Sequence, residues 1–202
     1  MADIQKKYTP MQFTHLKGLN GISDAVLESH FKLYEGYVNR TNKLTETLSG
    51  LQSQGQALGA NPAYAEMTRR MGFEYNGMIL HEYYFGNMKP SGSSAGASGQ
   101  LKQAMEQSFG SYENWLSDFK AVGTSPGIGW AVTFQDPRTG WLSNHWITLH
   151  ENGNIAGYTP IIVMDAWEHA FVPDYKPFER AKYVDAYFQN IDFDACEARL
   201  KK

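Results

Sequence analysis

Apolar residues recur at helical spacing along the first half of the chain. One stripe comprises Val26, Leu27, His30, Phe31, Tyr34, Tyr37 and Val38. With Ser23 as its N-cap, this stripe predicts a long helix to about Ser49. After a break rich in Gly, Ser and Gln, Asn61-Pro62 has the pattern of an N-cap followed by proline at the first helical position. A second stripe then comprises Met67, Met71, Met78, His81, Phe85 and Met88. We therefore expect an antiparallel helical hairpin, preceded by about twenty extended residues.

The pattern changes after residues 90–99, a segment of Pro, Gly, Ser and Ala with the composition of a linker. We place a domain boundary there, between residues 1–90 and 91–202. Apolar periodicity beyond it predicts helices at about 100–108, 112–122 and 178–191, and a short C-terminal helix. Alternation or continuous apolar character predicts strands at 129–135, 141–150 and 161–164.

These elements define the expected fold class, which is α+β. An N-terminal domain made of a long helical hairpin is followed by an α+β domain with a small three-stranded antiparallel sheet. The chain of 202 residues, 42% of them hydrophobic, is long enough to bury a real core.

Composition excludes several functional classes. No apolar run approaches the roughly 18 residues of a membrane span. A net charge of −3 argues against a protein that binds nucleic acid through bulk positive charge. Cys196 is the only cysteine, which excludes an internal disulfide and a multi-cysteine metal site. The first residues lack the apolar core of a secretory signal, so we expect a cytoplasmic protein.

Two histidines and one Asp-His pair are the candidates for chemistry. His30 and His81 lie on the apolar stripes of different predicted helices, and Asp165 follows a buried strand with His169 four residues on. Each feature has an ordinary explanation, either a hydrogen-bonded core histidine or a helix cap beside a surface histidine. Together, three imidazoles and one carboxylate make a four-ligand set suited to Fe, Mn or Zn.

Other metal motifs are missing from the sequence. His81-Glu82 begins the His-Glu-x-x-His pattern of zinc proteases, but position 85 is Phe. No Glu-x-x-His pair occurs, which excludes the signature of the carboxylate di-iron bundles.

The chain resembles the iron/manganese superoxide dismutase family over nearly its whole length. The similar segments are Leu27–His30, His81–Phe85, Ser108–Ser111, Gly127–Trp130 and Asp165–Ala170, the last being the most specific. The resemblance implies that His30, His81, Asp165 and His169 bind one Fe or Mn ion per subunit, and that Glu168 lies at a contact between subunits. It implies dismutation of superoxide by a homodimer or a tetramer. The alternatives are a structural relative without redox activity and another mononuclear Fe/Mn enzyme on this scaffold.

The sequence departs from the family pattern around the implied metal. Family members carry a gateway tyrosine eight residues after the first ligand, on a helix with an extra-residue bulge. Tyr37 comes seven residues after His30, which fits a regular helix, so the resemblance implies that Tyr37 is the gateway tyrosine. Tyr34 stands where the family has a histidine, and the resemblance implies a catalytic role for both tyrosines and for His150. Val172 replaces a family tyrosine, so the resemblance implies a less polar gateway.

The resemblance also assigns residues around the ligands. Many family members place a glutamine beside the metal-bound solvent molecule, from one of two positions. Gly77, a small residue that leaves room, stands at the first position, and His150 stands at the second, so His150 is the candidate hydrogen-bond donor. The walls of the site would be Trp130, Trp167 and Phe85. Lys176 and Arg180 resemble the basic residues that steer the anionic substrate. The choice between iron and manganese stays open.

Overall fold

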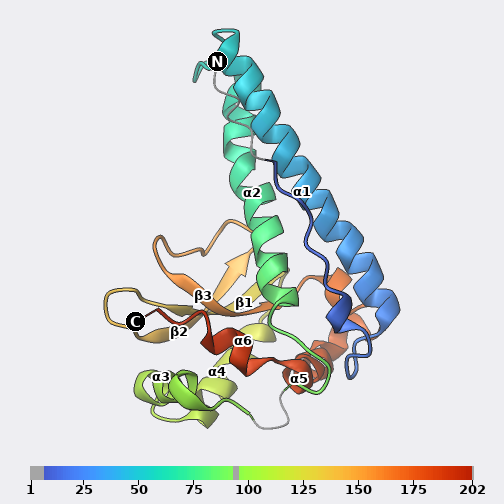
Figure 1. The fold of residues 1–202 in the computed structure, drawn as a ribbon, viewed down its shortest axis with the longest axis vertical. Helices are drawn as coiled ribbons and strands as arrows, with labels where there is room; N and C mark the ends of the chain where they lie inside the picture. Colours follow the sequence, from blue (N-terminus) through green and yellow to red (C-terminus); the bar gives the residue numbers. More distant parts are fainter. Residues whose placement is uncertain (1–6, 93–95, 202) are drawn as a thin grey trace.

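Two long helices form a hairpin that extends from one side of the molecule (Figure 1). The computed structural model describes residues 7–92 and 96–201. The hairpin consists of α1 (Asp24–Ser53) and α2 (Pro62–Phe85). The predicted caps are confirmed, because the side chains of Ser23 and Asn61 accept hydrogen bonds from the first turns of α1 and α2. α1 is a regular α-helix that continues one turn past the predicted end, through Gly50.

The segment before α1 is not wholly extended, contrary to the prediction. Residues Thr14–Leu16 form a 3-10 turn, η1, and Leu16 is completely buried. The apolar side chains of Phe13, Leu19 and Ile22 are buried around it, so core contacts rather than local periodicity fold this segment. Residues 1–6 of the predicted arm lie outside the described residues.

The second half of the chain packs short helices around a sheet. The helices are α3 (Gly99–Phe109), α4 (Tyr112–Gly123), α5 (Arg180–Asn190) and α6 (Phe193–Glu197). The strands are β1 (Gly129–Gln135), β2 (Leu142–Thr148) and β3 (Thr159–Asp165). The strand order is β2-β1-β3 and both neighbouring pairs are antiparallel. This arrangement confirms the α+β fold with a three-stranded antiparallel sheet.

Boundaries in this half differ from the prediction by one or two residues, and β3 begins at Thr159 rather than residue 161. β2 ends at Thr148, before the predicted end at His150, because Leu149 has a φ of 57° that turns the chain out of the strand. The helix predicted from residue 178 begins with a 3-10 turn, η3 (Pro177–Glu179), before α5. The division into 1–90 and 91–202 stays a prediction, and residues 93–95 of the predicted linker lie outside the described residues.

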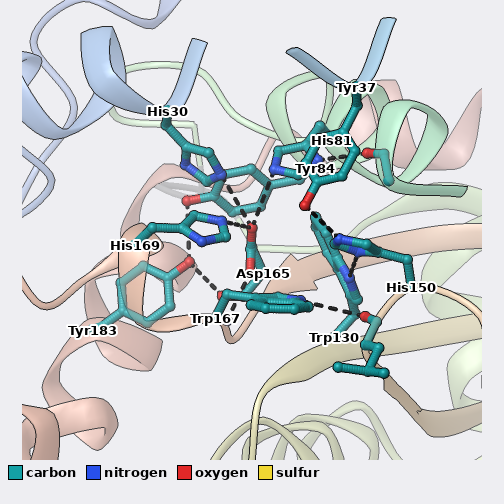
Figure 2. Close-up of polar contacts among 12 residues, drawn as sticks. His30, Tyr37, His81, Tyr84, Trp130, His150, Asp165, Trp167, His169 and Tyr183 are labelled. Atoms are coloured by element: carbon teal, nitrogen blue, oxygen red, sulfur yellow. Dashed lines mark hydrogen bonds and ion pairs between the residues drawn. The ribbon is translucent and has the colours of Figure 1, made fainter. Parts of the chain in front are cut away.

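The sheet brings the two halves of the chain together. α2 packs against β3, and α4 covers β1 and β2. β1 is buried along its whole length. The packing of α2 on β3 sets His81 close to Asp165, at the end of β3 (Figure 2). In the part of the chain that the structure describes, no helix has the length and apolar character needed to cross a membrane.

Candidate metal centre

Four side chains from four elements converge in the interior. His30 belongs to α1, His81 to α2, Asp165 ends β3, and His169 lies in the 3-10 turn η2 (Glu168–Ala170) (Figure 2). One nitrogen or oxygen of each lies within 4.8 Å of the others. His30, His81 and Asp165 are buried, and the side chain of His169 keeps 29% of its surface exposed. The structure thus brings together all four residues predicted as ligands.

Asp165 is the centre of this cluster. Its Oδ2 lies 3.1 Å from Nε2 of His30, 3.1 Å from Nε2 of His169 and 3.6 Å from Nε2 of His81. Its Oδ1 accepts a hydrogen bond of 2.7 Å from the backbone N–H of Trp167, which fixes the carboxylate plane. Burial alone would raise the pKa of Asp165, but attraction to His169 and hydrogen bonds from His169 and His30 hold that pKa below its usual range.

His81 presents a lone pair to the cluster. Its Nδ1 lies 2.5 Å from the carbonyl oxygen of Gly77, and a carbonyl can only accept, so Nδ1 carries the proton. The opposite atom, Nε2, is buried and has no hydrogen-bond partner among the described residues. Burial lowers the pKa of His81 well below its ordinary value and also lowers the pKa of His30. Both rings are therefore neutral at pH 7, the form in which imidazole binds metals.

The donor set fits iron or manganese. Three imidazole nitrogens with one carboxylate oxygen suit Fe and Mn, and the cluster contains no thiolate. A buried Nε2 without a partner is costly, and a bound cation would remove that cost. The residues present therefore match a mononuclear metal of this kind.

His150 lies beside the cluster and is hydrogen-bonded through both of its ring nitrogens. The indole N–H of Trp130 can only donate, and it lies 3.0 Å from Nδ1 of His150. Burial lowers the pKa of His150 to about 4, so the ring is neutral and its proton is on Nε2. Nε2 then donates to the hydroxyl oxygen of Tyr37 at 2.7 Å. The proton of the Tyr37 hydroxyl stays available to another acceptor, and burial raises the pKa of Tyr37 to about 12.

The turn at Leu149 explains the position of His150. The left-handed backbone there directs the imidazole into the interior, where it stacks on Trp167 with ring centroids 4.9 Å apart. Trp130 meets His81 edge to face at 4.9 Å, and Phe85 meets His30 at 5.0 Å. The predicted wall residues thus surround the ligand cluster.

Gly77 does not leave an empty space, although its small size suggested one. A Cβ at this position would lie 2.5 Å from Cδ1 of Tyr37. The ring of Tyr37 fills the volume beside Gly77 and stacks on His81, with centroids 5.2 Å apart. Gly77 is therefore required for the close approach of Tyr37 to α2.

Tyr34 is directed elsewhere. Its hydroxyl donates to Oε1 of Glu82 at 2.8 Å and accepts from the backbone N–H of Met11 at 3.0 Å. Burial raises the pKa of Tyr34. The hydroxyl thus ties the N-terminal segment to α2, and a catalytic role for Tyr34 stays a prediction.

The residues predicted at the surface have mixed surroundings. The guanidinium of Arg180 donates to the carbonyl oxygens of Ser125 and Gly127 at 2.6 and 2.7 Å. Lys176 and Glu168 are exposed, and Val172 is half-buried. Two N–H groups of Arg180 are therefore used in hydrogen bonds to the backbone. The steering of the substrate anion by Arg180 and Lys176 stays a prediction.

Sequence reasoning missed three aromatic residues that contact either the cluster or His150. Tyr84 packs on His30 with centroids 5.3 Å apart, and the hydroxyl of Tyr183 donates to the carbonyl oxygen of Asp165 at 2.7 Å. Phe73 meets His150 at 4.5 Å. Tyr84 lies three residues after His81, so helical spacing could have found it. Tyr183 is distant in sequence from the residues it meets, and no local pattern predicts its contact.

The fold places three histidines and one aspartate together in the interior, and these are the donor types of a mononuclear iron or manganese protein. Residues 97–199 match the C-terminal domain of the iron/manganese superoxide dismutases. An iron superoxide dismutase of Cupriavidus metallidurans is 37% identical, covering 90% of this chain and 90% of that protein. One of Aquifex aeolicus is 35% identical, covering 93% and 89%. A manganese superoxide dismutase of Haloferax volcanii is 32% identical, covering 100% and 97%.

The chain therefore belongs to the iron/manganese superoxide dismutase family. It is an enzyme of that class, which disproportionates superoxide at a mononuclear iron or manganese site. The family, the activity and the cofactor predicted from the sequence are confirmed.

Proposed function

We propose that His30, His81, Asp165 and His169 are the ligands of the iron or manganese ion in this chain. The observation that supports this most directly is the convergence of three Nε2 atoms on Oδ2 of Asp165, with the lone pair of His81 unpaired. The bound metal would exchange one electron with each of two superoxide ions, which become oxygen and peroxide. His30 and His81 supply neutral imidazoles, and Asp165 supplies a negative charge that partly offsets the charge of the cation.

The chain must also hold and move protons, because peroxide forms with two of them. We propose this role for Tyr37, supported by His150. Since Trp130 fixes the tautomer of His150, Nε2 of His150 donates to Tyr37 and leaves the hydroxyl proton of Tyr37 to be given away. Aromatic rings around the pair exclude water, which strengthens hydrogen bonds inside the site.

We also propose a homodimer with Glu168 at its contact, and a cytoplasmic location. Glu168 is exposed and directly precedes His169, whose side chain is itself partly exposed, so a second subunit could reach the edge of the site here. A tetramer is the alternative assembly. Cys196 is the only cysteine, so the chain lacks the internal disulfides that are common in secreted proteins. Light scattering on Glu168→Lys against the wild type tests the dimer: an unchanged mass would contradict it.

Metal analysis with rapid-mixing decay of superoxide tests the ligand assignment. We expect about one iron or manganese ion per wild-type chain, and metal content well below one with loss of turnover in His81→Gln. His145→Gln is the matched control, because His145 pairs with Ser143 outside the cluster. Full metal content in His81→Gln would contradict the assignment. A metal-loaded wild type without superoxide decay would favour another reaction, or no redox activity, at this centre.

A further inference from the structure

A buried carboxylate on α2 lies between two arginines. Glu74 is 2% exposed. Its Oε2 accepts from Nε of Arg40, on α1, at 2.7 Å, and its Oε1 accepts from Nε of Arg70 at 2.9 Å. A buried carboxylate is costly unless it is paired, and here each oxygen has its own guanidinium. We call these three residues, Glu74, Arg40 and Arg70, the Glu74 brace.

Both arginines of the brace lie on aromatic rings. The Cζ of Arg40 lies 4.5 Å from the centroid of the Tyr37 ring, and the Cζ of Arg70 lies 3.9 Å from the centroid of the Phe73 ring. These are the distances of cation–π contacts. The planar guanidinium can face a ring while its Nε–H is held by a carboxylate, which a lysine cannot reproduce.

The two rings meet at His150. The centroid of the Phe73 ring lies 4.5 Å from that of His150, and the centroid of Tyr37 lies 4.8 Å from it. The Tyr37 hydroxyl is also hydrogen-bonded to Nε2 of His150. Glu74 therefore binds two arginines, each arginine lies on one aromatic ring, and both rings contact the imidazole of His150.

A glycine on α1 makes room for the brace. A Cβ at Gly36 would lie 2.9 Å from Nη1 of Arg40, because Arg40, one turn later, lies back across Gly36. Glycine inside a helix costs about 1 kcal/mol relative to alanine. Alanine at this position would favour the helix and at the same time push the guanidinium away from its place.

We propose that Glu74 is a positioning residue for the reaction. Through Arg40 and Arg70 it holds Tyr37 and Phe73 against His150, and so fixes the direction of the Tyr37 hydroxyl beside the metal ligands. The inference rests on the proposed role of Tyr37 and His150. Arg40 also joins α1 to α2, so the experiments must separate positioning from simple stabilisation of the hairpin.

The first experiment compares Glu74→Gln with Glu66→Gln. Glu66 pairs with Arg69 on the exposed surface of the same helix, so its variant removes an ion pair that does not touch Tyr37. At equal metal content we expect superoxide turnover to fall about 10-fold in Glu74→Gln, the lower end for loss of an outer partner of a metal site. The Glu66→Gln variant should match the wild type.

The second measurement does not depend on activity. The indole N–H of Trp130 donates to His150, so its signal in a proton–nitrogen correlation spectrum reports the position of that ring. The full-length chain is labelled at tryptophan and kept free of metal, because iron and manganese broaden nearby signals. Trp130→Phe identifies the signal. We expect it to move in Glu74→Gln and to stay in place in Glu66→Gln.

The third variant, Gly36→Ala, keeps every charge of the brace. Its control is Gly50→Ala on the same helix, where an added Cβ meets nothing within 4 Å. We expect Gly36→Ala to lower turnover several-fold and to move the Trp130 signal, at a thermal midpoint no lower than that of the wild type. Gly50→Ala should leave turnover and the signal unchanged. If Glu74→Gln does not fold, turnover and the Trp130 signal of Gly36→Ala alone test the proposal.

Two results would overturn the proposal. One is turnover within about twofold of the wild type in both Glu74→Gln and Gly36→Ala. The other is an unmoved Trp130 signal in both, because any loss of turnover would then not pass through His150. If the wild type itself shows no superoxide turnover, the proposed function fails, while the Trp130 signal still tests the brace.

Discussion

Gly77→Ala tests how closely the site depends on the placement of Tyr37. The added Cβ would lie 2.5 Å from Cδ1 and 2.7 Å from Cε1 of the Tyr37 ring. Carbon atoms pack at about 3.5–4.0 Å, so the ring must move by about 1 Å. The Tyr37 ring has little freedom to move, because it stacks on His81 and its hydroxyl is hydrogen-bonded to His150.

The magnitudes follow from opposing effects. Alanine in place of glycine gains up to about 1 kcal/mol of helix propensity, and overpacking costs about 1–3 kcal/mol. We therefore expect a loss of stability between zero and about 2 kcal/mol, which leaves the protein folded. A displacement of about 1 Å in a proton-donating group can cost on the order of 100-fold in rate, so we expect turnover to fall 10- to 100-fold.

The assay is rapid-mixing decay of superoxide at equal metal content, with thermal unfolding measured in parallel. Gly50→Ala is again the control, since it gains helix propensity without a contact. Wild-type turnover in Gly77→Ala at full metal loading would refute the reasoning. A crystal structure of the variant with the Tyr37–His150 hydrogen bond unchanged would refute the geometric step on which it rests.

Three further predictions concern stability and reactivity. Tyr34→Phe removes the hydrogen bonds of the hydroxyl with Glu82 and with the N–H of Met11, two groups that water can still reach. We therefore expect a loss of about 0.5–1.5 kcal/mol in urea unfolding, while turnover falls less than in Gly77→Ala. Burial raises the pKa of Cys196 to about 12, so a thiol reagent at pH 8 should react only after unfolding; fast reaction of the native protein would contradict this. Removing the metal with a chelator should lower the thermal midpoint, because the ion binds the folded state alone; an unchanged midpoint would mean no net stabilisation.

Local signals in the sequence predicted most of the fold. The caps at Ser23 and Asn61 and the strand at 129–135 were each predicted from a few neighbouring residues. The turn at Thr14–Leu16 was missed because long-range burial of Leu16, not periodicity, folds it. The end of β2 was missed because leucine is an uncommon residue for the left-handed conformation that Leu149 adopts.

The sequence could supply the candidate ligands, and the family resemblance could supply the wall residues, whereas neither could show how the side chains between α1 and α2 pack. His30 and His81 lie on apolar helix faces, so burial and proximity follow from the hairpin. The space beside Gly77 is different, because only the packing of α1 on α2 decides that Tyr37 fills it. The periodicity of a sequence predicts the helix face on which a residue lies. The residue that it contacts on the opposite helix is known only from the structure.

Two groups set the direction of hydrogen bonds around the candidate ligands, because one can only accept and the other can only donate. The carbonyl of Gly77 can only accept, so it fixes the proton of His81 on Nδ1 and turns the lone pair of Nε2 toward Asp165. The indole of Trp130 can only donate, so it fixes the proton of His150 on Nε2 and turns it toward Tyr37. Each imidazole is thereby committed to one tautomer at neutral pH, since burial keeps both neutral. His81 thus presents a lone pair to the proposed metal site, and His150 donates to Tyr37, the proposed proton donor.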